Sequence, residues 1–122
     1  MKRQFICYPK CTTCQKAKKW LDEQGMEYEQ RHIKDQHPSA AELETWWKQS
    51  GLPLKRFFNT SGLLYKSLQL KEKLLTMSEA EMLTLLATDG MLVKRPLLIA
   101  DDKILVGFKQ AEWEQAKAGA SE

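Results

Sequence analysis

Phe5-Ile6-Cys7-Tyr8-Pro9-Lys10-Cys11-Thr12-Thr13-Cys14 leads from an apolar, strand-like run into a helical pattern. Residues 3–8 carry β-branched and aromatic side chains and end at a proline-containing turn, which predicts a short buried strand. Residues 12–24 are rich in helix formers, and Gly25 is placed to end the helix in a left-handed conformation. Two thiols one helical turn apart therefore stand at the start of a helix, where a redox site is expected.

The next segment completes a βαβ unit. Residues 26–33 are short and alternate imperfectly between apolar and polar side chains, which predicts a second strand. A right-handed crossover then makes the two strands parallel and lays the helix over one face of the sheet.

The middle third of the chain has the signals of helices. Capping boxes formed by Ser39 with Glu42 and by Ser78 with Glu81 predict two helix starts, with the second helix running to Gly90. A further helix is expected at about residues 63–68. The turn-rich residues just before it, 57–62, could serve only as the entrance to that helix or could approach the active site.

Two strands and a helix are predicted near the C-terminus. The apolar residues 97–100 and 104–106 flank a short polar turn at 101–103, as in an antiparallel hairpin, and a last helix covers about 110–118.

The order of these elements predicts an α/β fold of the thioredoxin-like (glutaredoxin-like) type. Its sheet has four strands and is mixed. We expect a single thioredoxin-like domain over residues 1–122 with a helical insertion at about 38–90.

Composition limits the kind of protein this can be. The chain has 122 residues, 43% of them hydrophobic, and a net charge of +3 from 19 basic and 16 acidic residues. No dense block of Lys and Arg is present, so no nucleic-acid partner is predicted. No apolar run approaches a membrane span and no signal-peptide cleavage site is seen, which predicts a cytoplasmic protein without a membrane partner.

The two cysteines of the CxxC pair have different predicted roles. Cys11 lies at the edge of the helix, where free backbone N–H groups and the helix dipole favour a thiolate, so it is the expected nucleophile. Cys14 lies inside the first turn and is the expected resolving thiol. Residues i and i+3 across one turn are close enough for a disulfide, so Cys11 and Cys14 can form a redox-active disulfide bond.

Two metal-based interpretations compete with the redox pair. A zinc site normally needs a second CxxC or a matched pair of histidines, and His32 and His37 are too dispersed to supply it. The spacing of Cys7, Cys11 and Cys14 also matches an iron–sulfur motif, but that motif belongs to a loop of a much larger barrel than 122 residues can build. We therefore predict no bound metal. Cys7 is then a small buried apolar residue or, alternatively, a second redox thiol.

The step Arg95-Pro96 is the second informative site. A proline just before a strand often stands in a tight turn, and Pro96 is a candidate for a cis peptide bond. In the predicted topology this turn faces Cys11, so Arg95 could stabilise a thiolate or another anion there. The alternative is a surface arginine that pairs with a carboxylate.

Four separated stretches resemble the arsenate reductase-like family, which includes the glutaredoxin-coupled arsenate reductases and the Spx regulators. They are Tyr8-Pro9-Lys10-Cys11-Thr12-Thr13-Cys14, residues 57–65, residues 89–96 and Val106-Gly107-Phe108-Lys109. The resemblance runs over roughly residues 3 to 117. It implies a thioredoxin-like domain with inserted helices, a nucleophilic Cys11, and Arg95 ahead of a cis Pro96.

The chain departs from the arsenate reductases in three places. They carry a single cysteine in the active loop, and two of their arginines are replaced here at about Asn59 and at Phe108 or Lys109. Three arginines suit a tetrahedral oxyanion, whereas this chain keeps only Arg95, so we expect thiols rather than arsenate as substrates.

The resemblance implies two functions. The first is a thiol-disulfide oxidoreductase, similar to the arsenate reductases, that has no bound cofactor and is reduced by glutathione or by a thioredoxin or glutaredoxin system. Its substrate would be a disulfide or an oxidised small molecule. The alternative is an Spx-like redox-sensing transcriptional regulator that binds the α subunit of RNA polymerase, although residues 57–62 differ from the corresponding Spx loop. A structural domain with an incidental CxxC is the third possibility.

Overall fold

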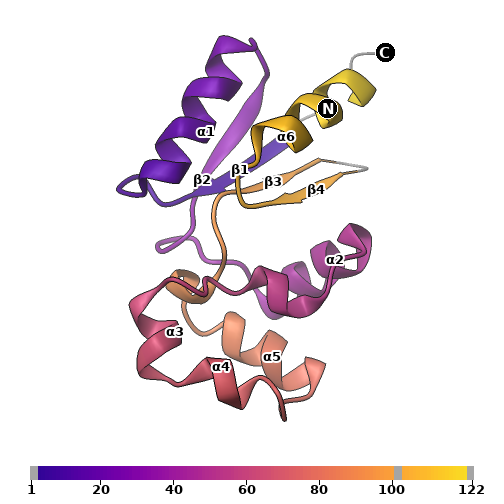
Figure 1. The fold of residues 1–122 in the computed structure, drawn as a ribbon. Coiled ribbons are helices and arrows are strands. Elements are labelled where there is room, and N and C mark those ends of the chain that lie inside the picture. The colour runs from indigo at the N-terminus through magenta and orange to yellow at the C-terminus, as the bar shows by residue number, and fades with distance from the viewer. Residues whose placement is uncertain (1–2, 101–102, 121–122) are drawn as a thin grey trace.

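A computed structural model describes residues 3–100 and 103–120, with side chains described as far as residue 116. Its centre is a four-stranded sheet in the order β2-β1-β3-β4 (Figure 1). Strand β1 is parallel to β2 and antiparallel to β3, and β3 is antiparallel to β4. The strands are β1 (Arg3–Cys7), β2 (Tyr28–His32), β3 (Leu97–Ile99) and β4 (Ile104–Val106). The predicted mixed thioredoxin-like sheet is confirmed.

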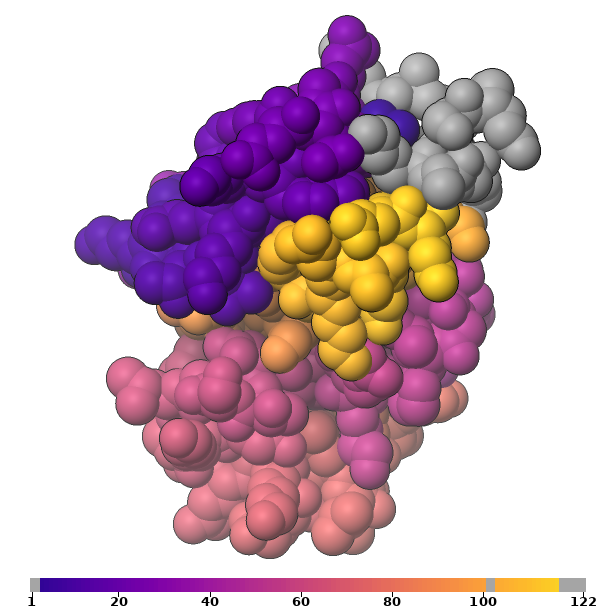
Figure 2. Space-filling model, turned by 45° about the horizontal axis from the view of Figure 1, so that its top comes forward, coloured from indigo at the N-terminus to yellow at the C-terminus, as the bar shows by residue number. Residues whose placement is uncertain are grey.

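Helices α1 (Thr12–Glu23) and α6 (Gln110–Ala120) cover one face of this sheet, and Figure 2 shows them side by side from outside. The apolar side chains of α1 point inward because Ala17 and Leu21 are four positions apart, on one side of the helix. They pack with Phe5 of β1 and with Trp113 of α6, all buried. After α1, Gly25 adopts the predicted left-handed conformation, with φ 66°.

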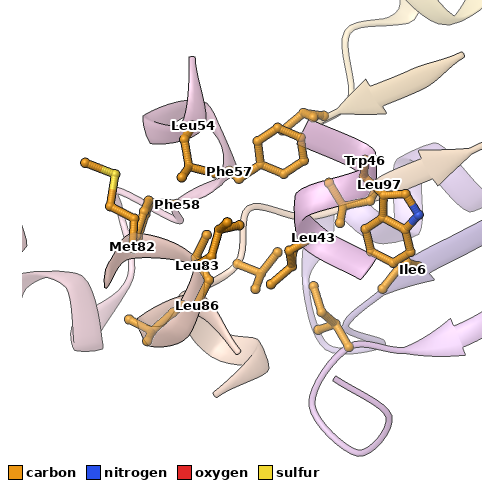
Figure 3. Close-up of a cluster of buried hydrophobic side chains, with 14 of the residues drawn as sticks. Ile6, Leu43, Trp46, Leu54, Phe57, Phe58, Met82, Leu83, Leu86 and Leu97 are labelled. Carbon is orange, nitrogen blue, oxygen red and sulfur yellow. The ribbon is translucent and has the colours of Figure 1, made fainter. Parts of the chain in front are cut away.

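The inserted helices pack on the opposite face (Figure 1). They are α2 (Ala40–Ser50), the 3-10 helix η1 (Leu54–Phe57), α3 (Leu63–Ser67), α4 (Leu70–Lys73), α5 (Glu79–Leu86) and the 3-10 helix η2 (Gly90–Leu92). Ile6 and Leu97 of the sheet share a buried cluster with Leu43 of α2 and Leu86 of α5 (Figure 3). The insertion is thus held by the same sheet that α1 and α6 cover from the other side.

Both predicted capping boxes are present. The Ser39 and Ser78 side chains each accept a hydrogen bond from the backbone N–H three residues on, and the backbone N–H of each serine donates one to the carboxylate of the glutamate there. The prediction that α5 runs to Gly90 was wrong. The helix ends at Leu86, and the Asp89 side chain caps η2 by accepting a 2.8 Å hydrogen bond from the Met91 N–H. Gly90 allows close packing instead, since a Cβ there would lie 1.8 Å from the Ile33 carbonyl oxygen.

The predicted hairpin joins β3 and β4, with Ile99 paired to Ile104. The Ala100 N–H donates to the Lys103 carbonyl at 2.9 Å across its turn, although residues 101–102 of the predicted turn lie outside the described residues. Within the described ranges, no helix is long and apolar enough to cross a membrane.

One ion pair ties the edge of the sheet to the insertion. Arg31 of β2 donates two hydrogen bonds to the Glu42 carboxylate of α2, at 2.7 and 2.8 Å, and its guanidinium lies over the Trp46 ring. The Arg31 hydrogen bond is the main reason why the Glu42 pKa falls from 4.5 to about 2. The Glu42 carboxylate also accepts a hydrogen bond from the Ser39 N–H in the capping box. One carboxylate therefore stabilises the start of α2 and connects it to β2.

We predict that Glu42→Gln lowers the free energy of unfolding by about 1–2 kcal/mol at pH 7. Because the folded state lowers the pKa, the stabilisation is complete above the unfolded pKa near 4.5 and disappears as the pH falls through about 2. Urea denaturation of both proteins from pH 7 to pH 2 tests this. Glu44→Gln, which removes an exposed pair with Lys48 on the same helix, is the control with a small effect. A pH-independent difference would contradict the prediction.

Candidate active site

Cys11 stands at the N-cap of α1. Its backbone has the extended conformation usual for that position, with φ −82° and ψ 123°, and its N–H donates to the Tyr8 carbonyl at 2.9 Å. The tight turn through Pro9 and Lys10 thus leaves the Cys11 side chain partly exposed at the end of the helix. Cys7, Cys11 and Cys14 are all free thiols in this structure.

The surroundings of Cys11 favour its thiolate. Partial burial opposes ionisation, but hydrogen bonds from the backbone and thiol of Cys14 and from the backbone of Thr13 outweigh it, with a further contribution from the Arg95 charge. The net result is a pKa below the usual 9.0 for Cys11. The backbone donors are the free N–H groups at the helix start, as expected for a thiolate at a helix N-terminus.

Cys14 has the opposite character. Its side chain is buried among the apolar residues between α1 and the sheet, and burial raises its pKa to about 12. The nearby Cys11 adds to this rise, while a hydrogen bond from the Tyr8 N–H at 3.3 Å opposes it. At neutral pH the pair therefore consists of one activated thiol and one protonated thiol.

Cys7 lies in β1 and is buried in the same cluster as Cys14. Its sulfur accepts a hydrogen bond from Gln30 Nε2 at 3.4 Å, and burial raises the pKa of its thiol. These surroundings suit a small buried residue. A second redox role for Cys7 stays a prediction.

Arg95 is held beside Cys11 by packing rather than by a carboxylate. The Arg95–Pro96 peptide bond is cis, and the guanidinium lies 5.3 Å from the centre of the Tyr8 ring. Its Nη1 donates to the Met91 carbonyl at 3.5 Å, while its Nε is buried with no hydrogen-bond partner. Within the described part of the chain, no ion pair involves Arg95.

A pocket of about 430 Å³ opens in front of Cys11. Its walls come from four places: the start of α1, residues 56–62 of the insertion, the segment before β3 and the segment after β4. In Figure 2 the start of α1, in indigo, lies next to the rose-coloured part of the insertion. The lining residues are Cys11, Thr13, Arg56, Asn59, Ser61, Gly62, Lys94, Arg95, Val106, Gly107, Phe108 and Lys109.

Backbone hydrogen bonds hold residues 57–62 at the pocket. Phe58 and Val93 form an isolated antiparallel bridge, with Lys94 N–H bonded to Phe57 O and Asn59 N–H bonded to Leu92 O, both at 2.8 Å. Of the two interpretations left open for this loop, the structure supports an approach to the active site.

The pocket holds more positive charge than the sequence analysis predicted. Besides Arg95, the cations Arg56, Lys94 and Lys109 line it. In the sequence, Lys109 stands out only as a possible replacement for a family arginine, and nothing local marks Arg56 or Lys94 as a site residue. The net positive charge of the chain is a weak signal of an anion-binding site, because it does not show which basic residues lie close together in the fold.

No described group of three or more His, Cys, Asp and Glu side chains is arranged to hold a metal ion. His32, one of the two histidines considered for zinc, packs its ring edge-on against Tyr8 and faces Asp35 at 3.8 Å.

A family model described as the ArsC family matches residues 7–116. The chain belongs to the ArsC family. The uncharacterized protein YusI of Bacillus subtilis is 56% identical over 115 residues, which cover 94% of this chain and 98% of YusI. The crystal structure of an ArsC family related protein from Bacteroides fragilis is also 56% identical, with a TM-score of 0.92 over 94% of this chain and 97% of that one.

Other relatives in this ArsC group are regulators. The regulatory protein MgsR of Bacillus subtilis is 30% identical over 88% of this chain and 84% of its own. The global transcriptional regulator Spx of Staphylococcus epidermidis is 26% identical over 85% of this chain and 78% of its own. The relatives of this chain thus include an ArsC family related protein and proteins named as regulators.

We predict that Cys11 is alkylated by iodoacetamide with a pH midpoint below 9, whereas Cys14 stays protected until the pH approaches 12. Arg95→Gln should raise the Cys11 midpoint, because the variant removes a charge that stabilises the thiolate. Mass spectrometry of the labelled peptides measures both. An unchanged midpoint in the variant would show that Arg95 does not act on this thiol.

The Tyr8 ring should help to keep the Arg95 guanidinium near Cys11 through a cation–π contact. Tyr8→Leu removes the aromatic face beneath the guanidinium and is expected to raise the Cys11 midpoint in the same direction as Arg95→Gln. Tyr8→Phe keeps the ring and should stay near wild type. Equal midpoints in the leucine and phenylalanine variants would contradict this role.

Proposed function

We propose that this protein is a thiol-disulfide oxidoreductase that uses Cys11 as its nucleophile and Cys14 as its resolving thiol. The observation that carries the proposal is the pairing of a Cys11 thiol of lowered pKa, in the wall of a cationic pocket, with a Cys14 of raised pKa buried behind it. A low pKa supplies an attacking thiolate at neutral pH.

The proposed reaction begins when the Cys11 thiolate attacks one sulfur of a substrate disulfide. That S–S bond breaks, the other sulfur leaves as a thiolate, and a mixed disulfide forms on Cys11. Arg95 stabilises the negative charge near the reacting sulfurs.

Cys14 completes the reaction. Once Cys11 is in a mixed disulfide it no longer carries a charge, so its contribution to the high pKa of Cys14 disappears. Cys14 gives its proton to water and attacks the Cys11 sulfur. The mixed disulfide bond breaks, the second half of the substrate leaves as a thiolate, and a Cys11–Cys14 disulfide forms. The pair has then donated two electrons, and two thiols of glutathione, or a thioredoxin or glutaredoxin system, reduce it again.

The relatives favour one alternative, a redox-sensing transcriptional regulator that binds the α subunit of RNA polymerase. Its support is the similarity to MgsR and Spx, whose names describe regulators. In that function the same disulfide would alter a binding surface and no substrate would turn over.

The test is turnover of disulfide and arsenate substrates by wild type and by Cys11→Ser. Disulfide turnover that is lost in Cys11→Ser, by at least about 10³-fold, supports the oxidoreductase. Arsenate serves as the second substrate because the pocket cations could also accept an oxyanion. Capture of RNA polymerase with no turnover would favour the regulator and sink the oxidoreductase.

Cys14→Ser separates the two cysteine roles. We expect this variant to stop at a mixed disulfide on Cys11, since no thiol remains at position 14 to resolve it. Intact-mass measurement followed by peptide mapping locates the adduct. An adduct on Cys7 instead of Cys11 would contradict the assignment of Cys11 as the nucleophile.

A further inference from the structure

Three thiols lie where β1 ends and α1 begins, and the proposed reaction uses only two of them. Cys11 and Cys14 form the proposed redox pair, whereas Cys7, the last residue of β1, has no part in it. Cys7 is 2% exposed and belongs to the same buried cluster as Cys14. A free thiol beside a disulfide can exchange with it.

The Cys7 side chain points toward α1. Successive residues of a strand face opposite sides of the sheet. Ile6 is buried among the inserted helices, whereas its neighbours Phe5 and Cys7 are buried in the cluster that α1 and α6 form with the sheet. Cys7 on β1 and Cys14 on α1 therefore lie in the same apolar layer between these two elements.

A hydrogen bond holds the Cys14 sulfur at the end of β1. The Tyr8 N–H, on the residue directly after Cys7, donates to Cys14 Sγ at 3.3 Å. Because two covalent bonds join the Tyr8 nitrogen to the Cys7 Cα, Cys14 Sγ lies within about 6 Å of that Cα. The Cys7 thiol also helps to raise the pKa of Cys14, in agreement with this proximity. A small shift of either side chain brings the two sulfurs into bonding distance.

Two polar side chains act on the Cys7 sulfur within this apolar layer. Gln30 Nε2 of β2 donates a hydrogen bond to it at 3.4 Å. Lys18 lies one turn after Cys14 on α1, is bonded to the Tyr28 hydroxyl at 2.9 Å, and lowers the Cys7 pKa through its charge, although burial outweighs both effects. A cysteine that only fills space needs neither group, whereas a thiolate formed during exchange is stabilised by both.

The three thiols differ in how readily they leave a disulfide. Exchange is faster when the released thiol has a low pKa, and a stabilised thiolate also favours the product side. The Cys11 pKa is lowered, while burial raises the pKa of both Cys7 and Cys14. In a Cys11–Cys14 disulfide, attack on the Cys14 sulfur therefore releases the better leaving group.

We infer that Cys7 and Cys14 form a second disulfide and that this bond is the resting oxidised state of the protein. The inference rests on the proposed function, which supplies the Cys11–Cys14 disulfide. Cys7 gives its proton to water, and its thiolate attacks the Cys14 sulfur. The Cys11–Cys14 bond breaks, the Cys7–Cys14 bond forms, and Cys11 leaves as a thiolate. The number of disulfides is unchanged, so no oxidant or reductant is consumed.

This exchange returns the nucleophile to the pocket. Cys11 can then attack a second substrate disulfide, but Cys14 is no longer free to resolve the adduct. The oxidised protein therefore holds the second mixed disulfide until an external thiol releases it. A single chain thus uses two cysteines when it is reduced and one when it is oxidised.

Peptide mapping distinguishes the two disulfides. Trypsin cleaves after Lys10, so Cys7 falls in peptide 4–10, while Cys11 and Cys14 fall in peptide 11–16. The wild-type protein is oxidised with one equivalent of diamide and then labelled with iodoacetamide while folded at pH 7. A Cys7–Cys14 bond links the two peptides and leaves the label on Cys11, whereas a Cys11–Cys14 bond leaves the peptides separate.

We expect the linked peptides in more than half of the oxidised protein. A smaller share would overturn the inference and leave the oxidoreductase standing. If diamide forms no bond between any two cysteines of the wild type, the proposed function itself fails.

Replacement of Cys7 is the matched comparison. Cys7→Ala should keep the Cys11–Cys14 bond after diamide, so that Cys11 is unlabelled in more than half of the protein. Cys7→Val, which refills the space of the thiol, should behave in the same way and so separates lost exchange from lost packing. Labelling of Cys11 equal to that of the oxidised wild type in both variants would overturn the inference.

Cys11→Ser leaves Cys7 and Cys14 as the only thiols. We expect this variant, refolded from urea in a glutathione redox buffer so that access to buried thiols is not limiting, to lose about 2 Da as the bond forms. The same protein with Cys7→Ala added is the control and should form no intramolecular bond. A Cys11→Ser protein that refolds with both thiols free or glutathionylated would also overturn the inference.

Discussion

The free backbone N–H groups at the start of α1 are the constraint around which the site is organised. They can stabilise a thiolate only if Cys11 is held at the N-cap, and the turn after β1 holds it there through the hydrogen bond to the Tyr8 carbonyl. The same turn places the Tyr8 N–H against Cys14 and the Tyr8 ring beside Arg95. A change in this short turn would therefore disturb both thiols and the guanidinium together.

The insertion forms one wall of the pocket through which a molecule would reach Cys11. Cys11 and Cys14 lie at the start of α1 and Arg95 lies just before β3, whereas Arg56, Asn59 and Ser61 come from the part of the insertion between α2 and α3. The bridge between Phe58 and Val93 fixes this second wall to the segment that carries Lys94. The Cys11 thiol and the wall opposite it thus come from different parts of the chain, and one fold can carry different functions when such a wall changes.

Local signals in the sequence predicted much of the fold. The capping boxes of α2 and α5 and the turn at Gly25 each involve residues within a few positions of one another. They can therefore be predicted from the sequence without the tertiary structure. The short helix α4 was missed because four residues carry no helical period, and it is held by burial of Leu70 and Leu74.

The candidate site divides in the same way. Cys11 and Cys14 form a local motif and were identified directly, whereas Arg56, Lys94 and Lys109 meet only because the bridge to Val93 and the pairing of β3 with β4 bring distant segments together. Each is an ordinary basic residue in its own stretch of sequence. No rule based on spacing along the chain relates them.

The burial of Cys14 has a thermodynamic consequence. Cys14 is part of the apolar cluster that joins α1, α6 and the sheet. A new bond to its sulfur therefore changes the free energy of unfolding of the whole fold. Folding and disulfide formation are two steps of one thermodynamic cycle. The change in the free energy of unfolding that a Cys11–Cys14 bond causes therefore equals the change in the free energy of that bond that folding causes. The packing around Trp20 and Trp113, whose rings also contact Phe108 in the pocket wall, is therefore linked to the stability of any Cys11–Cys14 bond.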